Sequence, residues 1–270
     1  RHPRVAVPRA PASALLPAQL TVEALDGRRH VVNRIGSSNG GSLIEAAAVG
    51  VLGAGLAGAV GAAFDVALPL AVIGGANGAI CGWRRVYDLG CSTGVAAVVL
   101  DSTWALPMTA AGLVSQGFGL LRGRPEYDAS LSRRANRQVY GRGFVPRRGF
   151  AITVGNVVSG AGDTSLPRRR RLVSDHEDVH VWQGRWFGPF YPLLYGSWML
   201  LGGAAGVAVW LVGRRSERLT KVVESCAYYL NPFEWWAYSR HGHWPPSGKV
   251  AGLGWTRPIA RPFAAQRPIP

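Results

Sequence analysis

Cysteine and lysine are both scarce in this sequence. The chain has 270 residues but three cysteines, Cys81, Cys91 and Cys226, and no two of them form a C-x-x-C pair. This argues against a disulfide framework and against a thiolate zinc site, so we interpret the cysteines as packing residues. Lys221 and Lys249 are the lysines among 30 basic residues, and such a preference for arginine is typical of a GC-rich bacterial genome.

Acidic residues are few as well, and the resulting charge balance indicates a membrane protein. The sequence has 15 acidic and 30 basic side chains, a formal net charge of +15, 48% hydrophobic residues and 36 glycines. These values are unusual for a soluble domain and fit a protein of the cell membrane with basic loops and the lipid bilayer as a partner. The arginines flank apolar segments instead of alternating with aromatic residues, which argues against nucleic acid as a partner.

The first 40 residues lack the continuous apolar run of a secretory signal peptide, so membrane insertion is expected to depend on internal segments. They are rich in Arg, Pro and Ala up to Gln19, after which Asp26-Gly27 separates two short apolar runs. Because glycine accepts the positive φ of a tight turn, we predict a short hairpin at this pair.

Charge is almost absent from residues 43–83, where Glu45 and Asp65 are the exceptions. This run is long enough for two membrane helices, with Asp65 as an intramembrane carboxylate or at the apex between them. Small residues recur every four positions, which lets helices pack closely within the chain, in a homo-oligomer or in a membrane complex. These residues are Gly50, Ala54, Gly58 and Ala62, and then Gly74, Gly78 and Gly82.

A second apolar stretch, residues 91–121, is interrupted at residues 101–104 and at Pro107. Neither half spans a bilayer comfortably, so we predict a kinked helix or a partly inserted pair of helices. Asp101 is expected to cap a helix there, with a catalytic role as the alternative. The next residues, 122–160, are rich in arginine, and residues 138–140 and 150–154 have the pattern of strands.

The clearest chemical motif is H-E-x-x-H at residues 176–180. Residues four apart on a helix share one face, so His176 and His180 can bind one metal ion while Glu177 reaches a water on that ion. Ser174 or Asp175 is the expected cap at the start of this helix. Four consecutive arginines precede the motif and are predicted to contact lipid phosphates. They are Arg168, Arg169, Arg170 and Arg171.

Residues 190–213 are apolar throughout and long enough to cross a membrane once. Two acidic residues that follow, Glu224 and Glu234, are candidates for a third metal ligand. If either joins the histidines, both ends of the apolar segment must lie on the same side of the membrane. We therefore predict that the glycines at 202–206 turn a re-entrant hairpin, with the metal site at the membrane surface.

The stretch from His176 to Gln183, together with N-P-F-E at residues 231–234, resembles the gluzincin-like membrane-associated zinc metallopeptidases over residues 150–238. The resemblance implies that Glu177 is the general base and that Glu234, or alternatively Glu224, is the third ligand beside His176 and His180. It also implies that residues 150–158 form a peptide-binding edge strand, with Phe150, Ile152 and Val154 beside the substrate. Asp178 departs from the family, which usually has an apolar or small residue there.

The predicted fold class is an α+β membrane protein with glycine-rich membrane helices and a small zincin-like domain. That domain combines a short sheet, the H-E-x-x-H helix and an E-x-x-A helix. The predicted units are residues 1–40, 41–121, 122–238 with an inserted apolar hairpin at 190–213, and a Pro/Arg-rich tail at 239–270, in which His241 and His243 are expected to be ordinary polar residues.

The predicted function is zinc-dependent hydrolysis of peptide bonds in a peptide or protein substrate. Two other functions stay open. One is a non-catalytic structural or assembly subunit of a membrane complex with a degenerate metal site. The other is a lipid-binding or transport protein that uses the basic flanks and Asp65.

Overall fold

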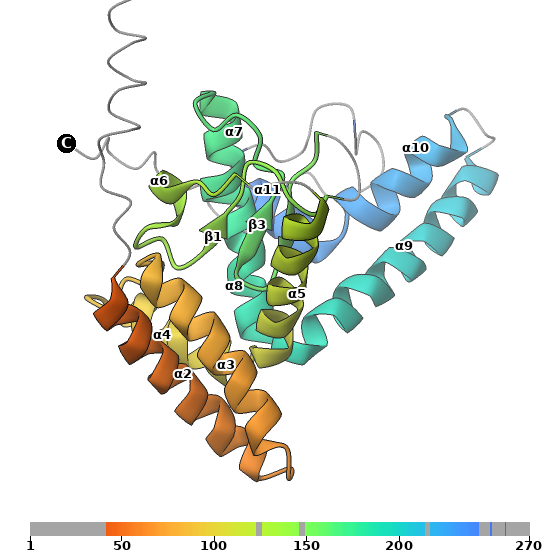
Figure 1. The fold of residues 1–270 in the computed structure, drawn as a ribbon. Helices are drawn as coiled ribbons and strands as arrows, with labels where there is room; N and C mark the ends of the chain where they lie inside the picture. The colour runs from red at the N-terminus through yellow and green to blue at the C-terminus, as the bar shows by residue number, and fades with distance from the viewer. Residues whose placement is uncertain are drawn as a thin grey trace, which may run out of the picture. The chain divides into compact units, whose positions relative to one another are not determined.

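The computed structural model describes residues 42–122, 126–145, 149–213 and 217–242, together with Lys249 and Arg257. These residues form a mostly helical unit with a small three-stranded sheet, shown in Figure 1. The mixed helix-and-sheet part of the fold prediction is confirmed. The hairpin expected at Asp26-Gly27 and most of the tail lie outside the described residues, and the division into four units stays a prediction.

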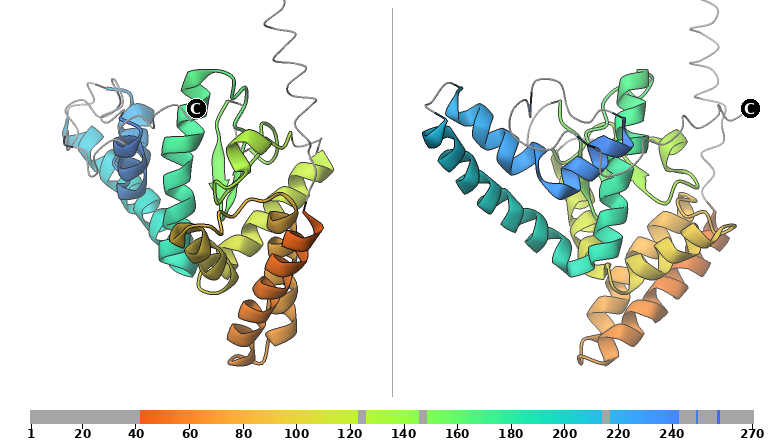
Figure 2. Two further views of the ribbon diagram at one scale, coloured as in Figure 1. Left: turned by 90° about the vertical axis from the view of Figure 1, so that its left-hand side faces the viewer. Right: turned by 180° about the vertical axis from the view of Figure 1, so that it is seen from behind.

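The first two helices form an antiparallel hairpin. Helix α2 (Leu43–Ala62) begins at Ser42, whose hydroxyl accepts a hydrogen bond of 3.2 Å from the backbone N–H of Glu45. Helix α3 (Ala67–Trp83) returns beside it, as both Figure 1 and Figure 2 show. Asp65 lies in the turn between the helices with a φ of 57°, so its predicted position at the apex is confirmed.

Glycine lets the backbones of α2 and α3 touch. A Cβ added at Gly74 would lie 2.4 Å from the carbonyl oxygen of Gly53, and one at Gly78 would lie 2.3 Å from that of Val49. The glycines of α3 in this contact are those predicted. The buried row of α2 lies one residue before the predicted row, which began at Gly50. The buried row consists of Val49, Gly53, Ala57 and Gly61. The seam joins two helices of one chain, and association with other copies stays a prediction.

Replacing Gly78 with alanine should destabilise this hairpin, because its Cβ would overlap the carbonyl oxygen of Val49. We expect a loss of about 1–3 kcal/mol in the free energy of unfolding. Thermal unfolding in detergent measures it. Gly55→Ala on α2 is the matched control, since nothing lies within 4 Å of a Cβ there. Equal melting temperatures for the two variants would contradict the close approach.

Helices α4 (Ser92–Ser102) and α5 (Leu106–Arg122) meet at an angle of 84°, which confirms the predicted kink. The role expected for Asp101 is wrong. Its carboxylate is buried and accepts hydrogen bonds of 2.8 Å from both Nε and Nη2 of Arg185, and the hydroxyl of Tyr87 donates a third. Since an unpaired buried charge is costly, Asp101 joins α4 to the helix of the metal motif instead of capping its own helix.

The sheet has the strand order β1-β3-β2. Strand β1 (Gln138–Val139) is parallel to β3 (Val157–Ser159), and β2 (Ile152–Val154) is antiparallel to β3. Gly155, in the turn between β2 and β3, has a φ of 58°, and a Cβ there would lie 2.2 Å from the carbonyl oxygen of Met108. The strands predicted at residues 138–140 and 150–154 are present in shorter form, and β2 is an outer strand. The prediction of a single edge strand over residues 150–158 is wrong, because the chain turns at Gly155 and returns as β3.

The metal motif lies within one continuous helical stretch. Helix α7 (Pro167–Arg171) leads into the π-turn η1 (Leu172–Glu177) and then into α8 (Asp178–Phe187). The cap predicted at Ser174 or Asp175 is therefore wrong, because the helix already begins at Pro167, whose fixed φ suits a first helical position. A π-turn is rare and is often found at functional sites, here directly at His176 and Glu177.

Helix α9 (Tyr191–Val212) follows a 3₁₀ turn, η2 (Gly188–Phe190), and is continuous. The turn predicted at residues 202–206 is wrong. Glycines in that stretch instead admit the returning chain, since a Cβ at Gly202 would lie 2.6 Å from the carbonyl oxygen of Cys226. Helix α10 (Leu219–Glu224) and the π-turn η3 (Ser225–Tyr229) run back along α9 to α11 (Pro232–Arg240), as Figure 2 shows.

Two helical stretches are long and apolar enough to span a membrane, Leu43–Ala62 and Pro167–Val212. The bent pair α4–α5 would be a third if it forms one span. Large apolar side chains cover the outside of α9, among them Leu193, Leu194, Leu200 and Leu201. Exposed surfaces of this kind are stable against lipid, which supports the predicted membrane association.

Candidate metal centre

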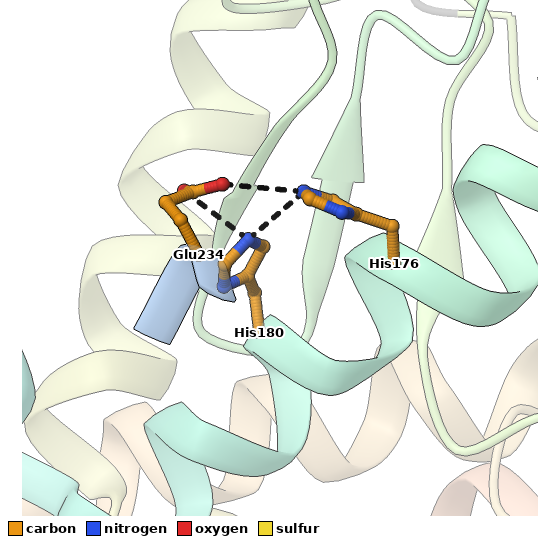
Figure 3. Close-up of side chains that lie close together, drawn as sticks. All are labelled: His176, His180 and Glu234. Carbon is orange, nitrogen blue, oxygen red and sulfur yellow. Dashed lines mark hydrogen bonds and ion pairs between the residues drawn. The ribbon is translucent and has the colours of Figure 1, made fainter. Parts of the chain in front are cut away.

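Three ligand-type side chains from two separate helices meet in the interior. His176 is the penultimate residue of the π-turn η1, and His180 follows one helical turn later on α8, so both imidazoles face the same side. Glu234 reaches them from the first turn of α11. That helix starts at Asn231, whose side-chain oxygen accepts a hydrogen bond of 3.1 Å from the N–H of Phe233. Figure 3 shows the three side chains converging.

The three side chains form a triangle of close contacts, in which Glu234 meets the two imidazoles through different carboxylate oxygens. The Nε2 atoms of His176 and His180 are 3.2 Å apart, and oxygens of Glu234 lie 3.4 Å from the first and 3.3 Å from the second. Zinc binds nitrogen and carboxylate oxygen at about 2.0–2.2 Å with tetrahedral angles, which separates neighbouring ligand atoms by about 3.3–3.5 Å. Each of the three contacts is therefore close to this spacing. A zinc ion held by both imidazoles and the Glu234 carboxylate would keep its fourth position for another ligand.

Glu234 and the imidazoles stabilise each other's charge. Burial would lower the pKa of His180, but Glu234 raises it to about 9, so a metal ion would displace the His180 proton on binding. Burial alone would raise the pKa of the Glu234 carboxyl, but the imidazoles of His180 and His176 outweigh burial and hold the pKa well below its usual range. The hydroxyl of Tyr195 on α9 also donates a hydrogen bond of 2.7 Å to Glu234 Oε1. Two imidazoles and one carboxylate are a donor set typical of catalytic zinc.

Glu177 is buried beside the triangle. It lines a cavity of about 580 Å³ that His176, His180 and Glu234 also line. Its Oε2 accepts a hydrogen bond of 2.7 Å from the hydroxyl of Thr153 on β2, so the sheet orients this carboxylate. Asp178, the residue that departs from the family, pairs with Arg137 just before β1. Its charge is therefore neutralised in an ion pair of its own.

Glu224 does not belong to the triangle. It lines the cavity, but it is exposed, and its carboxylate pairs with Lys249 at 3.2 Å. Within the part of the chain that the structure describes, His176, His180 and Glu234 are the one group of His, Cys, Asp or Glu side chains close enough to share a metal ion. The geometry thus favours Glu234 over Glu224 as third ligand.

No protein-family model, curated protein or solved structure matches this chain. The resemblance to zinc metallopeptidases therefore rests on the motif residues, and the structure adds a buried His-His-Glu group that could hold a metal ion.

None of the four arginines at residues 168–171 lines the cavity beside the metal group. Arg169 donates hydrogen bonds to carbonyl oxygens of Gly149, Gly160 and Ala161 and so holds the loops around β2 and β3. Contact of Arg168, Arg170 and Arg171 with lipid stays a prediction.

Gln183 is a site residue whose role the sequence did not reveal. It is fully buried, its Oε1 lies 2.8 Å from Nδ1 of His180, and its Nε2 donates a hydrogen bond of 3.0 Å to the carbonyl oxygen of Phe233. With the amide oriented in this way, Nδ1 of His180 is the protonated nitrogen and Nε2 is free to bind a metal. Gln183 also joins α8 to α11 next to Glu234.

Replacing Gln183 with leucine should weaken zinc binding by about 10–100-fold, the usual effect of losing a partner that orients a metal-bound histidine. Competition against a chromophoric chelator measures the affinity. Gln183→Glu keeps an acceptor for Nδ1 of His180 and should lose less. The melting temperature of the metal-free variants reports any general loss of packing. Zinc affinity unchanged in Gln183→Leu would contradict this role.

The cavity beside Glu177 lies over the whole metal group. Phe150, Ile152 and Val154, the residues of the predicted substrate strand, line it on one side. Tyrosines from α9 and η3 line much of the remainder, namely Tyr191, Tyr195, Tyr228 and Tyr229. The metal group therefore has access to a space large enough for several substrate side chains.

Proposed function

We propose that this protein is a membrane-associated, zinc-dependent peptidase. The buried group of His176, His180 and Glu234 is the observation that carries the proposal, because these three side chains lie close enough together to share one metal ion and are the donor types of catalytic zinc. The cavity over the triangle and the buried carboxylate of Glu177 beside it support hydrolysis over a purely structural metal. Structural zinc sites are normally closed by a fourth protein ligand, whereas catalytic sites keep one position open.

A bound zinc ion would supply a water of lowered pKa and would polarise the carbonyl of the substrate. Glu177 would accept the proton of the attacking water and pass it to the nitrogen of the leaving amine. Thr153 holds the Glu177 carboxylate through its hydroxyl. A peptide lying along the free edge of β2 would present its carbonyl groups to the same cavity, which is the role proposed for Phe150, Ile152 and Val154.

Removal and restoration of zinc test this function. The purified protein should contain about one zinc per chain, and the chelator-treated protein should lose cleavage of a mixed peptide library and regain it with zinc. Elemental analysis gives the stoichiometry, and mass spectrometry detects the cleavage products. Stoichiometric zinc without cleavage of any peptide would instead favour the alternative of a metal-bound assembly subunit.

A further inference from the structure

The lining of the cavity over the metal group comes in part from strand β2 and in part from the first half of the apolar helix α9. That helix contributes Pro192, Tyr195, Gly196 and Met199. Met108, at the start of α5, lines it as well. A substrate in this cavity would therefore contact a helix that has the length and composition of a membrane span.

Two of the helices that line the cavity, α5 and α9, carry apolar outer surfaces. Helices α5 and α9 begin close together, where the rings of Trp104 and Phe190 are 5.7 Å apart, and then diverge, as Figures 1 and 2 show. Phe118 and Leu121 of α5 are exposed, as is Leu194 on α9. Lipid would cover these side chains, so the cavity lies between two helices whose outer faces suit the bilayer.

Gly196 leaves open space on the part of α9 that lines the cavity. A Cβ built there would meet nothing within 4 Å, whereas at Gly202 and Gly206 on the same helix the returning chain is in contact. Packing therefore requires glycine at 202 and 206 but not at 196. The side chains next to this space, Tyr195 and Met199, present large apolar surfaces, which would favour a bulky apolar group over a charged one.

We infer that the cavity receives its substrate from the bilayer, as a polypeptide segment whose large apolar side chain occupies the space over Gly196. This inference rests on the proposed peptidase function and adds the substrate class to it. A membrane-inserted segment would pass between α5 and α9, lie against β2 and bring its backbone to Glu177. The apolar side chains of α5 and α9 along that path would favour apolar over charged side chains of the substrate.

Hydroxamates, which bind zinc directly, test the space over Gly196. Zinc-loaded protein in lipid nanodiscs is titrated with acetohydroxamate and with two dipeptide hydroxamates that carry either a benzyl side chain or none. We expect the benzyl probe to bind about 10–100-fold more tightly than its glycine counterpart. Gly196→Leu fills the space and should reduce this preference to less than about threefold.

Gly203→Leu is the matched control. Gly203 lies on the same helix, is half-buried like Gly196, has nothing within 4 Å of an added Cβ and does not line the cavity. The Gly203→Leu variant should retain the preference of the unchanged protein for the benzyl hydroxamate. A benzyl preference that is absent, or that survives in Gly196→Leu, overturns the inference alone. Failure of acetohydroxamate to bind zinc-loaded protein counts against the proposed function itself.

A photoreactive diazirine dissolved in the bilayer tests the route to the cavity. The residues of strand β2, Ile152–Val154, line the cavity. Their labelling by a reagent in the bilayer therefore reports a path from the lipid to the cavity. We expect such labelling, and we expect the benzyl hydroxamate to suppress it while labelling of Leu200 and Leu201 on the outside of α9 continues. Labelling confined to the outer faces of α5 and α9 would overturn the bilayer route.

Discussion

Replacing Glu177 with glutamine should leave zinc bound and lower the rate of peptide cleavage by about 10²–10⁴-fold, the usual contribution of a positioned general base. Glutamine has nearly the same shape and can still accept the hydrogen bond that Thr153 donates. It cannot accept the proton of the attacking water. Measurement of kcat/KM together with the zinc content of the purified variant separates the chemical step from metal loss.

Asp175→Asn is the matched control for this substitution. It also removes one carboxylate from the π-turn η1, two residues before Glu177, and asparagine keeps the oxygen that accepts the 2.9 Å hydrogen bond of Ser174. Its cleavage rate should stay close to that of the unchanged protein. An equal loss of cleavage rate in both variants would mean that the negative charge of the turn matters, and not a proton acceptor at position 177. Full activity in Glu177→Gln would remove Glu177 from the mechanism.

The histidine pair could be predicted from sequence because it depends on local geometry. Helical periodicity fixes the relation of His176 to His180 whatever surrounds the helix. Glu234 was suggested by resemblance, but its meeting with the histidines depends on contacts that no local pattern encodes. Gly202 and Gly206 allow η3 and α10 to pack against α9, and this packing returns the chain to the site.

Local rules failed where a distant partner decides the structure. Asp101 is a residue type that often caps helices, and its local sequence suggests that role. Its partner in the structure is Arg185, which is 84 residues away. The start expected at Ser174 or Asp175 follows the preference of helix caps for such residues, but Pro167 begins the helix earlier, ahead of a run of arginines with no apolar periodicity. Strand β3 has three residues, too few for an alternating pattern to identify.

Glu234→Ala should abolish stable zinc binding, and with it cleavage. The substitution removes one of three protein ligands, so the loss of affinity should exceed the roughly 10–100-fold expected for an orienting partner such as Gln183. It also leaves two buried imidazoles without the carboxylate that lies within 3.4 Å of both. Zinc titration against a chelator measures the effect, and the melting temperature of the metal-free protein shows whether α11 still packs.

Glu224→Ala separates the two glutamates that the sequence could not distinguish. Both belong to E-x-x-A patterns and both line the cavity, but Glu224 is exposed and pairs with Lys249. Since a surface ion pair contributes about 0–1 kcal/mol, this variant should melt and bind zinc almost as the unchanged protein does. Zinc loss in Glu224→Ala with retention in Glu234→Ala would transfer the ligand role to Glu224, and the metal would then lie outside the buried triangle.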